Sequence, residues 1–169
     1  QLLLAAEGMR AMGSGGGTPG GGGGIPRGGG PPGGGSGAGP PPRRLVVGAG
    51  KNTGRTPGAR PTDETLDRAL AADPDYVARI DKDLPGNVPR GAYDEVLLER
   101  IPSIPLVERK TYSNIGALLK PGGRVEILTA AVTPTAVLEQ MLADAGFTNI
   151  VADTVEIGGA KVLRVRATR

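Results

Sequence analysis

The chain has 169 residues, no cysteine, no histidine and a formal net charge of +3. The missing residue types exclude disulfides, thiolate catalysis, zinc sites of the usual kind and a Ser-His triad. With one Phe and three Tyr the chain offers no aromatic platform for single strands, and its slight charge does not indicate a nucleic-acid partner.

The first 42 residues do not predict a packed domain. Residues 13–42 contain 17 glycines and 7 prolines, which indicates a flexible linker. Residues 1–12 have helical composition, and we interpret them as the remnant of an upstream element, since the chain opens on Gln1 and not Met. Residues 43–169 then form one domain of ordinary size, and no run reaches membrane length, so we expect it to be soluble.

Apolar runs of strand length alternate with segments of helical period after residue 44, which predicts an α/β fold with a mostly parallel sheet. Strands are expected at residues 45–47, 76–80, 96–98, 124–130, 149–157 and 160–167. Helices are expected from Thr62 or Asp63, over residues 111–119, and from Thr133 to Gly146, with residues 120–123 as the turn that stops the second. Gly158 and Gly159 separate the last two strands and are a two-residue hairpin signal.

Two glycines follow the first expected strand in the stretch LVVGAGKNTG. In an open parallel sheet the ligand crevice lies at the carboxyl ends of the strands, where the strand order reverses. Gly48 and Gly50 would let the backbone turn sharply and approach a ligand without Cβ clashes. The alternative is a tight turn with no ligand.

Four stretches together resemble the class I S-adenosylmethionine-dependent methyltransferases. LVVGAG resembles the first-strand glycine motif, AYDEVLLE the fourth-strand motif, ALLKPGGRVEIL the passage into strand five, and LEQMLADAGFTNI the helix and strand that follow. The resemblance covers about Leu45 to Arg166. It implies a Rossmann-like fold with a seventh strand inserted antiparallel between strands five and six, S-adenosylmethionine as cofactor, and methyl transfer as the activity.

More narrowly, VGAGKN followed by PGARPTDE is similar to methyltransferase-like domains at the C-termini of bacterial Rhs-type and other polymorphic toxin proteins. This resemblance implies an effector module that is released from a larger, secreted bacterial protein and acts in a cytoplasm. A cognate immunity protein is the partner that it implies.

The methyltransferase resemblance also implies site residues. Those of the first loop are Val47, Gly48, Ala49, Gly50 and Asn52. The resemblance places Asp63 at the end of strand two, where an acid binds the ribose diol. It places Asp81 near the adenine, whose amine can donate a hydrogen bond to a carboxylate. Without a ligand, Asp63 is a helix N-cap and Asp81 a solvated charge.

Methyl transfer from a sulfonium disperses positive charge, so holding the nucleophile in line supplies most of the catalysis and a strong base is optional. If a base is needed, Asp94, Glu99 and Tyr112 are the candidates nearest the expected crevice. Asp94 precedes a buried strand, and its alternative role is structural.

The chain departs from the family pattern in three places. GAGKNTG replaces G-x-G-x-G, no acid precedes it, and KNTGRTPGARP cannot form the helix that follows strand one. RIPS at residues 100–103 does not match the Asn-Pro-Pro-Tyr tetrad of amino-methyltransferases, so the methyl acceptor is not specified.

Three functions therefore stay open. The first is a methyltransferase effector module, and the second is a degenerate methyltransferase fold that acts as a protein-binding module. The third is a nicotinamide-nucleotide enzyme, which is disfavoured because Thr53 stands where the third glycine of G-x-G-x-x-G belongs.

Overall fold

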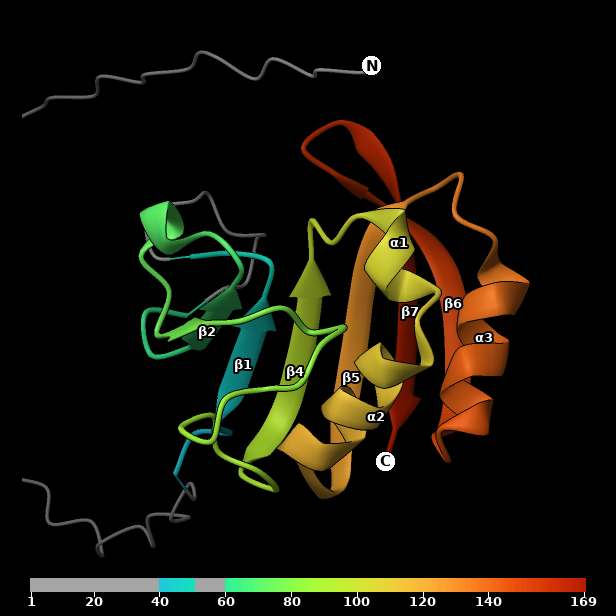
Figure 1. The fold of residues 1–169 in the computed structure, drawn as a ribbon. Helices are drawn as coiled ribbons and strands as arrows, with labels where there is room; N and C mark the ends of the chain where they lie inside the picture. Colours follow the sequence, from blue (N-terminus) through green and yellow to red (C-terminus); the bar gives the residue numbers. More distant parts are fainter. Residues whose placement is uncertain (1–39, 51–59) are drawn as a thin grey trace, which may run out of the picture. The chain divides into compact units, whose positions relative to one another are not determined.

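A computed structural model describes residues 40–50 and 60–169 (Figure 1). The expected upstream remnant, most of the expected linker, and Asn52 lie outside these ranges. Seven strands form one sheet in the order β3-β2-β1-β4-β5-β7-β6. Neighbours from β3 to β5 are parallel, whereas β7 is antiparallel to both β5 and β6. The predicted α/β fold class and its antiparallel insertion are confirmed.

The strands are β1 Arg44–Val47, β2 Glu64–Asp67, β3 Tyr76–Val77, β4 Tyr93–Glu99, β5 Leu119–Ala130, β6 Thr148–Ile157 and β7 Ala160–Thr168. The helices are α1 Ser103–Leu106, α2 Arg109–Leu118, α3 Thr135–Asp144 and the short 3-10 helix η1 Leu70–Ala72. Figure 1 shows α1, α2 and α3 on the same side of the sheet. No helix within the described ranges has the length and apolar character needed to cross a membrane.

Most of the core lies between the sheet and these helices, because side chains alternate between the two faces along each strand. The strands contribute buried aliphatic residues to it, among them Leu45, Val47, Val96, Leu98, Val125, Ile127 and Val165. The helices contribute Leu106, Ile115, Leu118, Leu138 and Leu142. A smaller apolar cluster of Val46, Ala49, Leu97 and Leu128 lies on the opposite face. β1 is therefore buried on both faces, as a central parallel strand requires.

The helix expected from Thr62 or Asp63 is wrong. Thr65 and Leu66 pair with Val46 and Val47 of β1, so this segment is strand β2. Leu66 is buried, but Leu70, which shared the helical spacing, is 76% exposed. The spacing therefore came from a strand followed by a single 3-10 turn and did not mark one buried helical face.

Residues Lys120–Gly123, expected as a turn after α2, lie inside β5 but leave the ladder with β4. Leu119 pairs with Tyr93 and the next partners are Arg124 and Glu95, so five steps on β5 match two on β4. Gly122 has φ +76°, and a Cβ on Gly123 would lie 2.9 Å from the Lys120 carbonyl oxygen. Both glycines are needed for this bulge.

The last hairpin agrees with the sequence, whereas two other expectations need correction. Gly158 and Gly159 both have positive φ and join the paired residues Ile157 and Ala160, as in a type I′ turn. β3 is shorter than expected and ends at Val77. Thr133 does not cap α3, because the N-cap residue is Pro134 and no side chain caps the helix. The hydroxyl of Thr133 instead lies 3.2 Å from that of Thr129.

Asp63 makes a buried ion pair at the start of β2. Its Oδ2 accepts hydrogen bonds from Nη2 of Arg44 at 2.5 Å, from Nε of Arg44 at 3.1 Å and from the amide of Arg60 at 2.7 Å. The Asp63 side chain is 2% exposed. It therefore ties the start of β1 to the start of β2 and does not cap a helix.

Replacing Asp63 with Ala should lower the free energy of unfolding by about 3 kcal/mol, because it removes the acceptor of a buried charge pair. Urea unfolding followed by circular dichroism measures this. The control is Asp83→Ala, whose side chain is 94% exposed and whose change should stay within about 0.5 kcal/mol. Equal urea midpoints for the two variants would contradict the structural role of Asp63.

Candidate functional site

The strand order reverses at β1, because β2 and β3 lie on one side of it and β4, the next strand in the chain, lies on the other. Such a switch point leaves a crevice at the carboxyl ends of the strands. A cavity of about 250 Å³ lies there, lined by residues at the ends of β1 and β2 and by the segments that follow β3 and β4. This cavity is the candidate functional site.

Gly48 forms the floor of the cavity where β1 ends. Its φ is +92°, its amide donates to the carbonyl of Leu66 at 2.9 Å, and a Cβ there would lie 2.1 Å from the carbonyl oxygen of Glu99. Only glycine fits this position. Val47 also lines the cavity, so the strand end and its turn are both presented to a ligand.

Ala49 and Gly50 do not line the cavity, unlike the two residues before them. Ala49 is fully buried in the small apolar cluster on the opposite face. A Cβ on Gly50 would lie 1.9 Å from the carbonyl oxygen of Ala72 in η1. These two residues therefore fix the course of the loop, and Gly50 allows it to pack closely on η1.

The acid at the end of strand two is Asp67 and not Asp63. Parallel pairing of Val47 with Leu66 places Asp67 beside Gly48, and Asp67 lines the cavity. Its Oδ1 accepts the amide of Ala69 at 2.7 Å, and within the described ranges no group donates to Oδ2. Asp63 lies before β2, at the other end of the strand. Asp67 follows Gly48 by 19 residues, close to the ~20 typical of an acid that binds ribose, and this spacing was the signal missed.

Asp81 lies on the cavity wall, in the segment after β3. It is 4% exposed. Arg79 donates to both of its oxygens, Nε to Oδ1 at 3.1 Å and Nη2 to Oδ2 at 2.7 Å. These hydrogen bonds lower the pKa of Asp81, so its carboxylate is charged at neutral pH and acts only as an acceptor.

The three candidate bases are in different places. Glu99 ends β4, is fully buried, and its carbonyl oxygen contacts the Gly48 turn. Asp94 lies near the start of β4, where it accepts from the amide of Arg43 and from Nζ of Lys120, both at 2.8 Å. Tyr112 is buried in α2, where it donates to the carbonyl of Leu106 at 2.6 Å, and burial raises its pKa. None of the three lines the cavity, and Glu99 comes nearest to it, because it precedes the lining residue Arg100 and lies beside the Gly48 turn.

The rest of the wall contains residues that the sequence did not single out. Arg68 follows β2, and Arg100 and Ile101 follow β4. Arg100 has φ +57°, a conformation that is uncommon outside glycine. Within residues 40–50 and 60–169 no three acidic side chains gather closely enough to hold a metal ion.

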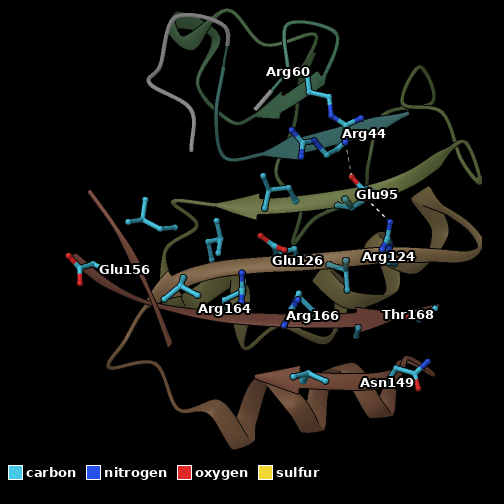
Figure 2. A pocket seen from close by; sticks show the side chains of 18 of the residues that line it. Arg44, Arg60, Glu95, Arg124, Glu126, Asn149, Glu156, Arg164, Arg166 and Thr168 are labelled. Carbon is cyan, nitrogen blue, oxygen red and sulfur yellow. Dashed lines mark hydrogen bonds and ion pairs between the residues drawn. The ribbon is translucent and has the colours of Figure 1, made fainter. Parts of the chain in front are cut away.

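A larger hollow of about 810 Å³ lies on the face of the sheet opposite the helices (Figure 2). Charged side chains from neighbouring strands line it. Glu95 of β4 accepts from Arg124 of β5 at 3.0 Å and from Arg60 at 3.5 Å, and Arg164 of β7 pairs with Asp153 of β6. These charges largely neutralise one another, and the hollow lies across the strands and not at their ends. We therefore place the functional site in the smaller cavity.

No protein-family model matches the sequence, and no curated protein sequence matches it significantly. Solved structures do match. The CurJ carbon methyltransferase superposes with a TM-score of 0.57 and 16% identity, over 76% of this chain and 49% of that one. The 1,6-didemethyltoxoflavin-N1-methyltransferase of Burkholderia thailandensis, solved with S-adenosylhomocysteine, gives 0.53 and 17%, over 76% and 71%. The 16S rRNA (adenine(1408)-N(1))-methyltransferase of Catenulisporales acidiphilia gives 0.52 and 18%, over 76% and 87%.

The chain spans about half the length of the CurJ structure. The acceptors named for these three enzymes differ, so at this low identity the likeness concerns the fold and not the substrate. The chain has the fold of the class I S-adenosylmethionine-dependent methyltransferases.

Proposed function

We propose that this chain is an S-adenosylmethionine-dependent methyltransferase whose cofactor binds in the cavity at Gly48. The observation that carries the proposal is a cavity at the switch point of a β3-β2-β1-β4-β5-β7-β6 sheet, with a glycine turn as its floor and an acid at the end of β2. Solved structures with this fold are methyltransferases of this kind, which supports the proposal.

The residues present fit such a cofactor. Gly48 lets the chain turn tightly against the carbonyl of Glu99, and Asp67 lies beside it with one carboxylate oxygen to which no described residue donates, as a ribose diol would require. Asp81 offers a charged acceptor to an adenine amine. The cavity is somewhat smaller than the ~300 Å³ at which ligand pockets usually begin, and residues 51–59, which continue the glycine turn, lie outside the described ranges.

The cofactor supplies a methyl group on a sulfonium. The chain's own contribution is to hold the acceptor's nucleophilic atom in line with that methyl. Such positioning alone can make methyl transfer fast. Cofactor binding falls to Val47, Gly48, Asp67 and Asp81, while Ala49 and Gly50 shape the loop. Glu99 is the candidate base that we retain, because the end of β4 contacts the Gly48 turn.

The finer proposal is that the domain is the C-terminal effector of a larger secreted bacterial protein with a cognate immunity protein. It rests on motif resemblance, which does not fix function. Its test is expression of the chain in the cytoplasm of a bacterial host. Growth arrest that Asp67→Asn relieves would support a toxin, and unimpaired growth with soluble wild-type chain present would contradict it.

A second candidate function is a protein-binding module without cofactor. Gly50 packs against the carbonyl of Ala72, so the glycine loop contacts η1. This contact favours the protein-binding module. A nicotinamide-nucleotide enzyme is the third candidate, and the pair Asp67-Arg68 at the end of β2 favours it, since an arginine there suits a 2′-phosphate.

We expect S-adenosylhomocysteine to bind the full chain with a micromolar or tighter Kd in calorimetric titration. At a hundredfold excess over Kd, such a ligand stabilises the fold by about 2.7 kcal/mol, so the melting temperature rises as well. NAD and NADP are the matched controls and should leave it unchanged. Folded protein that binds no S-adenosylhomocysteine would favour the protein-binding module, and a shift with NADP alone would favour the nicotinamide enzyme.

Asp67→Asn should weaken S-adenosylhomocysteine binding about tenfold or more, because hydrogen bonds to a charged acceptor contribute about 1.5–3 kcal/mol. The melting temperature of the ligand-free variant should change little, since its only hydrogen bond in the described ranges is the local one to Ala69. Calorimetric titration measures this affinity, and the control is Asp83→Asn, a change at an exposed surface acid. Unchanged affinity would remove Asp67 from the site.

A further inference from the structure

We propose that the methyl acceptor is an apolar compound with one negatively charged group, a carboxylate or a phosphate, and that Arg100 binds this group at the mouth of the cavity. The inference rests on the proposed function and adds the class of acceptor. It comes from the charges that line the cavity and from the surface that continues from it along α1.

The charges of the cavity wall do not balance. Three arginines, Arg68, Arg79 and Arg100, and two acids, Asp67 and Asp81, line it. Arg79 is fully engaged by Asp81 through two hydrogen bonds. Within the described ranges, Arg68 and Arg100 make no hydrogen bond or ion pair. Among the side chains that line the cavity, positive charges therefore exceed negative ones by one.

The two available guanidinium groups belong to symmetrical positions around Gly48. Val47 pairs with Leu66 on one side and with Leu98 on the other, so Arg68 and Arg100 each lie one residue past the level of the glycine. Two strand spacings separate β2 from β4, about 10 Å. Arg68 follows the acid that we assign to the ribose, which places it on the nucleoside side. Arg100 is on the β4 side, away from the nucleoside.

The backbone around Arg100 is shaped for this position. Its φ of +57° is a conformation that costs a non-glycine residue of order 1 kcal/mol or more. The turn directs the chain from β4 into α1, and Ile101, Pro102 and Pro105 continue the cavity wall. Such an outlier at the mouth of a cavity suggests a functional role, since a glycine would make the same turn without strain.

Two aliphatic side chains are exposed in the segment beyond Arg100. Ile104 and Val107, on and just after α1, are 67% and 46% exposed. Pro105 of the same helix lines the cavity, so a ligand that extends from the cavity along α1 would meet aliphatic side chains as well as Arg100. An organic anion with an apolar body matches both features.

Electrostatics favours an anion over the alternatives. A sulfonium cofactor bound in the cavity would add positive charge to that of the arginines on its wall, so a protonated amine would be disfavoured as the acceptor. An anionic acceptor would be attracted to these charges, and a bidentate arginine contact would also orient it.

The test uses the full chain saturated with S-adenosylhomocysteine and three probes, benzoate, phenyl phosphate and the neutral isostere benzamide. We expect calorimetry or NMR titration to show at least tenfold tighter binding of one of the anions than of benzamide. Arg100→Gln should remove that preference and leave the affinity for S-adenosylhomocysteine unchanged. Arg109→Gln, at a side chain 84% exposed on α2, is the matched control and should change neither.

Several results would overturn the inference. Equal binding of benzamide and the anions, or no binding of either anion, would remove the anionic acceptor. Loss of the preference in Arg68→Gln but not in Arg100→Gln would reassign the cation. Weaker S-adenosylhomocysteine binding by Arg100→Gln would show that Arg100 holds the cofactor's own carboxylate. Failure of the wild-type chain to bind S-adenosylhomocysteine would instead contradict the proposed function itself, and is seen before any probe is added.

Discussion

The structure depends on a four-residue strand, β1, that is buried on both faces and pairs with strands on both sides. Its neighbours β2 and β4 are held in register by the same residues, Val46 and Val47. Where β1 ends, Gly48 turns between the ends of both neighbours, and a Cβ there would collide with the carbonyl of Glu99. The strand that centres the sheet therefore ends at the cavity, and the tight turn there needs a residue with no side chain.

The sequence was informative where local chemistry and tertiary packing agree. The hairpin at Gly158 and Gly159 needs two left-handed residues, and glycine is the residue that supplies them. The two strands that this turn joins are then predicted to pair antiparallel, as the predicted fold class requires. Strand β2 was mistaken for a helix because apolar residues at Leu66 and Leu70 fit a helical spacing, and only pairing with β1 distinguishes the two. Short central strands have too few residues for a periodicity to identify them.

The same error explains which site residues were missed. With a helix assigned to the segment, Asp63 looked like the acid at a strand end, whereas the strand itself runs from Glu64 to Asp67. Asp63 instead meets Arg44, nineteen residues earlier in the chain, in a buried pair that no local pattern reveals. Asp81 lines the cavity, and its contact with an adenine stays a prediction. Arg100 carried no sequence signal, since its importance comes from backbone conformation and from the lack of a partner among the described residues.

The two faces of the sheet differ in a way that favours the strand ends as the proposed site. On β5, Val125 and Ile127 face the helices while Arg124 and Glu126 face the hollow of Figure 2, the alternation expected of a strand with one solvated face. Farther along the strands the residues on that same face are apolar, because Val46, Leu97 and Leu128 form a cluster there. Apolar contact on both faces is thus concentrated toward the carboxyl ends of the strands, around the turn at Gly48. A ligand bound there would rest on a part of the sheet that is packed on both faces, and in-line positioning of an acceptor requires such a firmly held site.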